Sequence, residues 1–220
     1  MRRGEEERGV VVDPTLDQPA LERALIVAAS VLDRGGVVAF PTETVYGLAA
    51  DPASLAAVAK VFDVKGRAVG EALPLIAVDV DAARSVAAVW SSVAAHLAAT
   101  FWPGPLTILV PVDESQVTPR VTAGRPTIGV RVSSHPVARA LAAVSPSGLI
   151  TATSANVSGT PTLATADAVT AALGRRVDLV VDGGASPGGL ASTIVDLSEG
   201  APRLVREGPI AFARVLESLR

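Results

Sequence analysis

The chain has 220 residues, of which 49% are hydrophobic and 19% are charged, and its formal net charge is −3 at neutral pH. Such a chain can bury a sizeable core, and its composition differs from that of disordered proteins. We expect a flexible, charge-dense tail at 1–9 and one folded domain at 10–220. The acidic balance argues against nonspecific binding to duplex nucleic acid, although it leaves room for a local basic cleft.

The supply of reactive side chains is narrow. The sequence has no cysteine, and its two histidines are His96 and His135. This excludes disulfides, thiolate metal sites and cysteine nucleophiles, and two imidazoles are too few for a histidine metal cage. Aromatic residues make up only 3% of the chain, so stacking platforms for single-stranded nucleic acid are scarce. The apolar stretch 24–32 is too short to span a bilayer, and we expect a cytoplasmic protein with no membrane association.

Hydrophobic periodicity predicts helices that alternate with short buried strands. The first helix is expected between Asp17 and the helix breaker Gly35. Strands are predicted at 37–40, 73–78, 106–112, 127–132, 149–152, 179–182, 193–197 and 204–206. Further helices are predicted at 52–64, 81–89, 91–101, 136–143, 165–173 and 209–219. Because the last strands follow one another without a helix between them, we expect an α/β fold in which helices flank a single twisted, mixed sheet.

Polar clusters follow several predicted strands, which is where α/β folds place their sites. Residues 41–47 supply three hydroxyls and the Glu43 carboxylate, and form either a ligand site or a capped turn. Lys65 and Arg67 either meet an anion or complement the end of a helix. Residues 153–159 are rich in small hydroxyl and amide side chains and can turn several donors toward one point, as a phosphate or carboxylate requires.

Two arginines lie within or at the end of predicted strands. Arg131 interrupts an otherwise apolar strand, where a guanidinium requires either an anionic ligand or a structural ion pair. Arg206 closes a later strand. No P-loop occurs in the sequence. The cations Lys65, Arg67, Arg131 and Arg206, together with the hydroxyl donors, therefore indicate a basic cleft that suits a polyphosphate and a carboxylate together.

The order of these blocks resembles the YrdC family. The blocks are F-P-T-E-T-V-Y-G-L at 40–48, K-G-R at 65–67, W-P-G-P-L-T at 102–107, V-R-x-x-x-H-P at 130–136, T-S-A-N-x-S-G at 153–159, S-T-I-V-D-L at 192–197 and R-x-G-x-I at 206–210. The last block lies close to the end of the chain, so the resemblance is to the short form of the family. It implies a YrdC-like fold with a basic cleft.

The resemblance also implies an activity, that of an L-threonylcarbamoyladenylate synthase in the t6A modification of tRNA. Such an enzyme makes threonylcarbamoyl-AMP and pyrophosphate from L-threonine, bicarbonate and ATP, and passes the product to a tRNA threonylcarbamoyl transferase complex. The reaction requires no covalent nucleophile, because it depends on positioning and charge neutralisation. Mg²⁺ is expected to enter with ATP rather than in a cage of protein ligands.

The family pattern also implies roles for individual residues. Threonine and its carbamate would be held by Thr44, Arg131, Ser154 and Ser192. ATP would be held by Lys65, Arg67, Thr127, Asn156 and Arg206. The catalytic cations would be Lys65, Arg67 and Arg131.

The segment between Arg67 and Val78 departs from the family pattern. Its insert is longer than usual, Leu73 stands where the family commonly has asparagine, and Val78 stands where it has histidine. Two alternatives therefore remain beside the synthase. One is a YciO-like paralogue with the same fold and a different activity, and the other is an RNA-binding module, for which weak RNA binding through the basic cleft would be expected.

Overall fold

The computed structural model describes residues 18–66 and 70–220. The expected tail at 1–9, the start of the domain near residue 10 and the helix-preceding Asp17 lie outside the described residues. So does Arg67. The helices are α1 (Gln18–Asp33), α2 (Leu55–Lys65), α3 (Val80–Ser85), α4 (Ser92–Phe101), α5 (Pro119–Thr122), α6 (Pro136–Val144), α7 (Ala166–Leu173), the 3₁₀ turn η1 (Gly174–Arg176) and α8 (Phe212–Ser218).

The strands divide between two mixed sheets. Those of the four-stranded sheet, in spatial order, are β7 (Thr153–Ser154), β2 (Gly47–Ala49), β1 (Val38–Phe40) and β8 (Leu179–Val180). Those of the six-stranded sheet are β10 (Arg203–Arg206), β9 (Thr193–Asp196), β4 (Leu106–Pro111), β5 (Thr127–Arg131), β3 (Leu75–Ala77) and β6 (Leu149–Thr151). The predicted α/β class with mixed pairing is confirmed, because parallel pairs such as β4 with β9 stand beside antiparallel ones such as β4 with β5.

The expected single sheet is split at Ala152. Strand β6 ends at Thr151 in the six-stranded sheet, and β7 begins at Thr153 in the other sheet. The Thr151 hydroxyl joins the two sheets, because it donates to the carbonyl of Leu48 at 2.8 Å and accepts from the amide of Ala50 at 3.0 Å. The chain therefore turns from one sheet into the other beside the polar block 153–159.

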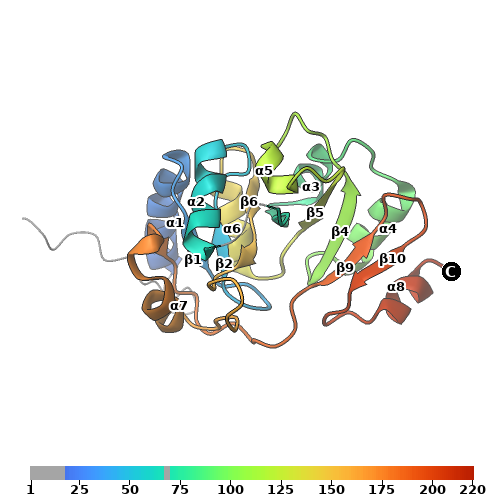
Figure 1. Cartoon of the computed structure of the whole chain (residues 1–220). Helices are drawn as coiled ribbons and strands as arrows, with labels where there is room; N and C mark the ends of the chain where they lie inside the picture. The colour runs from blue at the N-terminus through green and yellow to red at the C-terminus, as the bar shows by residue number, and fades with distance from the viewer. Residues whose placement is uncertain (1–17, 67–69) are drawn as a thin grey trace, which may run out of the picture.

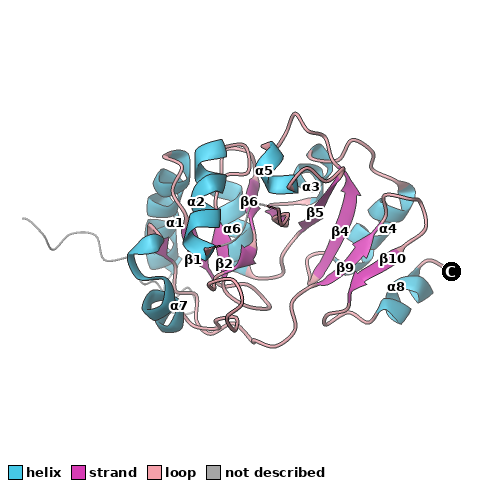
Figure 2. Ribbon diagram, viewed as in Figure 1, coloured by secondary structure: helices cyan, strands magenta, loops and turns pink. Residues whose placement is uncertain are grey.

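Helices lie around the outside of the strands (Figures 1 and 2). Helices α1 and α6 pack on each other and cover a hydrophobic cluster that joins both sheets through Phe40 of β1, Ile76 of β3 and Ile150 of β6. A larger cluster lies under α2, α4 and the central strands. In Figure 1, α4 and α8 stand beside β9 and β10, at the end of the molecule opposite α1 and α7.

Most element boundaries follow from local chemistry. Ser54 has extended backbone and caps the amide of Ala57, so the helix predicted from 52 begins at Leu55. At its other end Gly66 takes the left-handed conformation, with φ of 57°. The helix predicted at 81–89 ends at Ser85, because Ala87 instead forms an antiparallel bridge with Val112, just after β4. In the described part of the chain, no helix has both the length and the apolar character needed to cross a membrane.

Candidate active site

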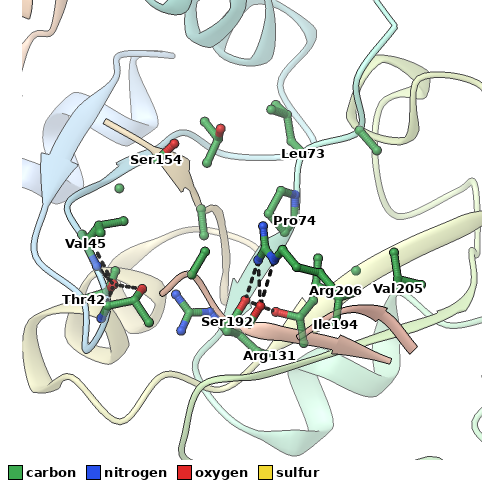
Figure 3. Close-up of a pocket in the computed structure, with 18 of the residues that line it drawn as sticks. Thr42, Val45, Leu73, Pro74, Arg131, Ser154, Ser192, Ile194, Val205 and Arg206 are labelled. Carbon is green, nitrogen blue, oxygen red and sulfur yellow. Dashed lines mark hydrogen bonds between the residues drawn. The ribbon is translucent and has the colours of Figure 1, made fainter. Parts of the chain in front are cut away.

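A cavity of about 420 Å³ opens between the two sheets. The loop after β1 and strand β7 supply one side of it, and strands β4, β5, β9 and β10 supply the other. Figure 3 shows Thr42, Val45 and Ser154 on one side, facing Ser192, Ile194, Val205 and Arg206 on the other. We call the first side the hydroxyl wall, defined by Thr42, Thr44 and Ser154. The second is the arginine wall, defined by Arg131, Ser192 and Arg206.

The hydroxyl wall begins with a self-bonded turn. The buried Thr42 hydroxyl donates to the carbonyl of Val45 at 2.7 Å and lies 2.9 Å from the Thr44 hydroxyl. It also accepts from the amides of Thr44 and Val45. Tyr46 holds the same loop in place, because its hydroxyl donates to the carbonyl of Gly184 at 2.9 Å. The pKa of this hydroxyl is raised, mainly by burial. The turn is thus fixed without a ligand.

Ser154 extends the hydroxyl wall, and the chain behind it is held by Lys65. The Ser154 hydroxyl donates to Asn156 Oδ1 at 2.6 Å. The buried Lys65 ammonium donates to the carbonyls of Ser154 and Asn156 and to Asn156 Oδ1, at 2.6, 3.1 and 3.2 Å. Lys65 and Asn156 therefore support the wall from behind, and neither is among the residues that line the cavity.

The arginine wall carries the charge of the site. Arg206 donates from Nε and Nη2 to the carbonyl of Ser192, at 3.0 and 2.8 Å, and from Nη2 to the Ser192 hydroxyl at 3.2 Å. The Ser192 hydroxyl in turn lies 2.9 Å from that of Thr107 on β4. Within residues 18–66 and 70–220 no carboxylate pairs with Arg206. Its guanidinium bonds only to neutral oxygens, so its positive charge is available to bind an anion.

The two arginines of this wall have different electrostatic surroundings. Burial lowers the pKa of Arg131, while the nearby Glu43 carboxylate opposes that change. Partial desolvation also lowers the pKa of Arg206, although the residue is exposed, and the positive charge of Arg131 lowers it further. A guanidinium keeps its proton at neutral pH even so. Because Glu43 pairs with Arg131, the uncompensated positive charge of the wall is that of Arg206, and this charge favours an anionic ligand.

The structure brings most of the predicted site residues together. Those that line the cavity are Thr44, Arg131, Ser154, Ser192 and Arg206. Thr127 is not in the lining, because it opens β5 and pairs with Pro111 at the end of that strand farther from Arg131. The Arg67 prediction falls outside the described residues. Leu73, which replaces the asparagine of the family pattern, is fully buried and lines the cavity, whereas Val78 lines a separate hollow beside Trp102.

Two charged residues of the site have no individual role among the sequence predictions, although Glu43 lies in the candidate block 41–47. Arg125 lines the cavity from the turn before β5, two positions before the strand begins and on the same alternation as Gly129 and Arg131. The alternation does not identify Arg125, however, because Thr127 shares it and does not line the cavity. Glu43 contacts Arg131, and only the three-dimensional pairing reveals this, because 88 positions separate the two residues.

The polar groups of this site are hydroxyls, amides and arginine guanidinium groups, and these are not the side chains that usually bind metal ions. In the part of the chain that the structure describes, histidines and carboxylates do not gather in groups of three or more that could hold a metal ion. The hydroxyl donors and arginine cations that line the cavity are groups that bind anions.

Comparison with known proteins connects this geometry to a family. The family model Sua5_yciO_yrdC, described as "Telomere recombination", matches residues 30–208. The Threonylcarbamoyl-AMP synthase of Bacillus subtilis is 38% identical over 205 residues, which are 93% of this chain and 59% of that protein. The chain thus spans little more than half the length of that relative.

Two solved structures share the fold. Sua5 of Pyrococcus abyssi, complexed with L-threonine, superposes with a TM-score of 0.86 at 35% identity, over 90% of this chain and 58% of that one. E. coli YciO superposes with a TM-score of 0.81 at 25% identity, over 93% of this chain and 97% of that one. The family model covers well over half of the sequence, and with these relatives it establishes that the chain belongs to the Sua5/YciO/YrdC family.

Proposed function

We propose that this protein is an L-threonylcarbamoyladenylate synthase. It would convert L-threonine, bicarbonate and ATP into threonylcarbamoyl-AMP, pyrophosphate and water. The observation that carries the proposal is the pairing of a hydroxyl wall with an arginine wall in one cavity. Support comes from the synthase name of the B. subtilis relative and from the L-threonine complex of the P. abyssi structure.

Each wall matches part of the proposed substrates. Arg131 would bind the threonine carboxylate, because a guanidinium can form two parallel bonds to a carboxylate. Thr44, Ser154 and Ser192 would orient the amino acid and its carbamate by neutral hydrogen bonds. Arg206 would meet the phosphates of ATP, since its charge is not compensated by a described carboxylate.

The other ATP-binding residues are proposed from the family pattern. Asn156 and Lys65 lie directly behind Ser154, and Lys65 would neutralise phosphate charge at that edge of the cavity. Arg67 and Thr127 complete the set. Mg²⁺ would arrive on the phosphates of ATP, because the donors that line the cavity suit anions.

The chemistry requires positioning rather than a protein nucleophile. The threonine amine attacks the carbon of bicarbonate, and loss of water gives the carbamate. A carbamate oxygen then attacks the α-phosphorus of ATP in line, and the bond to the β-phosphate breaks to release pyrophosphate. Of the catalytic cations proposed from the family pattern, Arg67 and Arg131 would hold the two anionic reactants together, and Lys65 would offset the developing negative charge from its place behind Ser154.

The product determines the partner that we propose. A mixed anhydride of a carbamate and AMP hydrolyses readily, so it must pass quickly to an acceptor. We place that acceptor in a transferase complex that modifies tRNA to t6A in the cytoplasm.

The test is pyrophosphate release by the purified protein with ATP and Mg²⁺. Threonine and bicarbonate are omitted in turn, and the nucleotide product is analysed by mass spectrometry. The proposal requires release that depends on both components, together with a threonylcarbamoyl adenylate. Release without that dependence, or no release, would contradict it.

The second candidate is a YciO-like paralogue. It is favoured by the full-length superposition on E. coli YciO and by the apolar Leu73 in the cavity lining. This candidate predicts no threonine-dependent release by the wild type but activity that appears with Leu73→Asn. An RNA-binding module predicts instead an RNA affinity that falls steeply with salt and does not respond to ATP or threonine.

A further inference from the structure

A buried ion pair joins the two sheets behind the arginine wall. Glu43 lies in the loop that follows β1, a strand of the four-stranded sheet. Arg131 is the last residue of β5, a strand of the six-stranded sheet. Glu43 Oε1 accepts a hydrogen bond from Arg131 Nη1, and its Oε2 accepts one from the hydroxyl of the fully buried Ser133. Only 7% of the Arg131 side chain and 13% of the Glu43 side chain remain exposed.

The carboxylate and the cavity lie on different sides of the guanidinium. Arg131 lines the cavity and Glu43 does not. Figure 3 shows the Arg131 guanidinium in the space between Thr42 and Ser192. Nη1 is occupied by Glu43, whereas Nε and Nη2 form no hydrogen bond to any residue that the structure describes. The unoccupied edge of the guanidinium is therefore the edge available to a ligand.

Glu43 has two different effects on Arg131, one on its charge and one on its orientation. The Glu43 carboxylate offsets the charge of Arg131, so it lowers the attraction for an anion instead of raising it. It also fixes the plane of a side chain that otherwise has four rotatable bonds, and a bidentate grip on a carboxylate depends on that plane. An arginine held in this way loses less conformational freedom when the ligand binds.

We propose that Glu43 is a positioning residue for the amino-acid substrate. It holds Arg131 from behind, so that the free edge of the guanidinium faces the α-carboxylate of threonine. The inference rests on the proposed synthase function and adds to it a residue that acts only through Arg131.

The test is a double-mutant cycle read by steady-state kinetics. We expect Glu43→Ala to raise the KM for threonine at least about tenfold, with the KM for ATP changed less than about twofold. Glu43→Gln keeps an oxygen acceptor for Nη1 and should recover part of the threonine KM. In an Arg131→Ala background, adding Glu43→Ala should change the threonine KM less than about twofold, because the group through which Glu43 acts is absent.

Matched controls separate this role from a structural one. Asp182 also anchors the loop 41–47, by accepting from the Tyr46 hydroxyl at 3.3 Å, but it does not contact Arg131. Asp182→Asn should leave the threonine KM within about twofold. Thermal unfolding of every variant identifies those that fail to fold, and the double variant removes both charges at once.

The outcomes distinguish the two levels of the proposal. A wild type without threonine-dependent release overturns the synthase and this inference together. An active wild type whose Glu43→Ala variant loses affinity for ATP and threonine equally, or loses as much in the Arg131→Ala background, overturns the inference alone.

Discussion

The two walls of the cavity hold their polar groups in opposite ways. On the hydroxyl wall, the buried Thr42 hydroxyl bonds within its own turn, and Ser154 bonds to Asn156. On the arginine wall, Arg206 rests on the carbonyl and hydroxyl of Ser192, and no described carboxylate pairs with it. The first wall is neutral and satisfied without a ligand, whereas the second keeps a charge that a ligand can neutralise.

The difference follows from where each wall lies in the fold. The hydroxyl wall is made by a loop after a three-residue strand and by the two-residue strand β7, so side-chain bonds must fix its shape. The arginine wall stands on the paired strands β5, β9 and β10, whose ladders already fix the backbone. Shape recognition is therefore expected from the hydroxyl wall, and charge recognition from the arginine wall.

The largest effect is expected at Arg206. Because a hydrogen bond to a charged group contributes about 1.5–3 kcal/mol, Arg206→Ala should lower kcat/KM for ATP by roughly 10- to 150-fold. Its stability should change little, since the side chain bonds only to Ser192. The measurement is pyrophosphate release against ATP concentration, with thermal unfolding in parallel.

Arg203→Ala is the matched control for this prediction. Arg203 lies on the same strand and is largely exposed, and it pairs with Asp196 rather than lining the cavity. It should keep kcat/KM within about twofold. Equal losses in both variants would mean that β10, rather than the Arg206 charge, supports the activity.

A smaller effect is expected on the hydroxyl wall. Thr44→Val keeps the shape of the side chain and removes one neutral hydrogen bond, which contributes about 0.5–1.5 kcal/mol. The KM for threonine should therefore rise roughly two- to tenfold, while the KM for ATP stays constant. A rise in the KM for ATP of the same size would contradict the division of labour between the walls.

The smallest kinetic effect is expected at Arg125. This side chain is exposed at the cavity mouth, and none of the carboxylates that the structure describes pairs with it. Arg125→Ala should raise the KM for ATP about two- to threefold at low ionic strength, and the difference should vanish above roughly 0.3 M salt because exposed charges are screened. A difference that persists at high salt would place Arg125 in direct contact with the phosphates.

The sequence predicted the elements well where hydrophobic pattern and capping residues agree. The helix predicted at 91–101 is Ser92–Phe101, with Ser91 as its cap, and the strand predicted at 127–132 is Thr127–Arg131. Strands β2 and β7 were not predicted, because Gly-Leu-Ala and Thr-Ser lack a run of β-branched apolar residues, and the pairing of β2 with β7 joins segments that are far apart in the chain. The division into two sheets depends on the same long-range pairing.

The candidate site shows a similar limit. The strand-end position of Arg131 and the donor-rich block around Ser154 could be inferred locally, and both residues line the cavity. For Arg131, an anion and an ion pair were equally open from the sequence, and the structure shows that the residue has an ion-pair partner in Glu43 while one edge remains open. Only the approach of the two sheets brings these roles together in one side chain.

A pH measurement tests the surroundings of the arginine wall without a substrate. His135 precedes α6 at its N-terminal cap, and its buried Nδ1 has no hydrogen-bond partner. Burial lowers its pKa from the ordinary 6.5, Glu43 opposes that change, and the charge of Arg139 adds to it. As pH falls through 6.5, His135 takes up a proton in the unfolded chain but not in the folded chain. The contribution of His135 to the free energy of unfolding should therefore decrease below that pH and be constant above it.

The measurement is urea unfolding of the wild type and of His135→Gln between pH 5 and 8. Glutamine does not titrate, so the variant should lose this part of the pH dependence while other groups keep theirs. If the wild type instead gained stability relative to the variant as pH fell, His135 would be charged in the folded protein. Glu43 would then be shared between His135 and Arg131, and the carboxylate could no longer be assigned to the arginine wall alone.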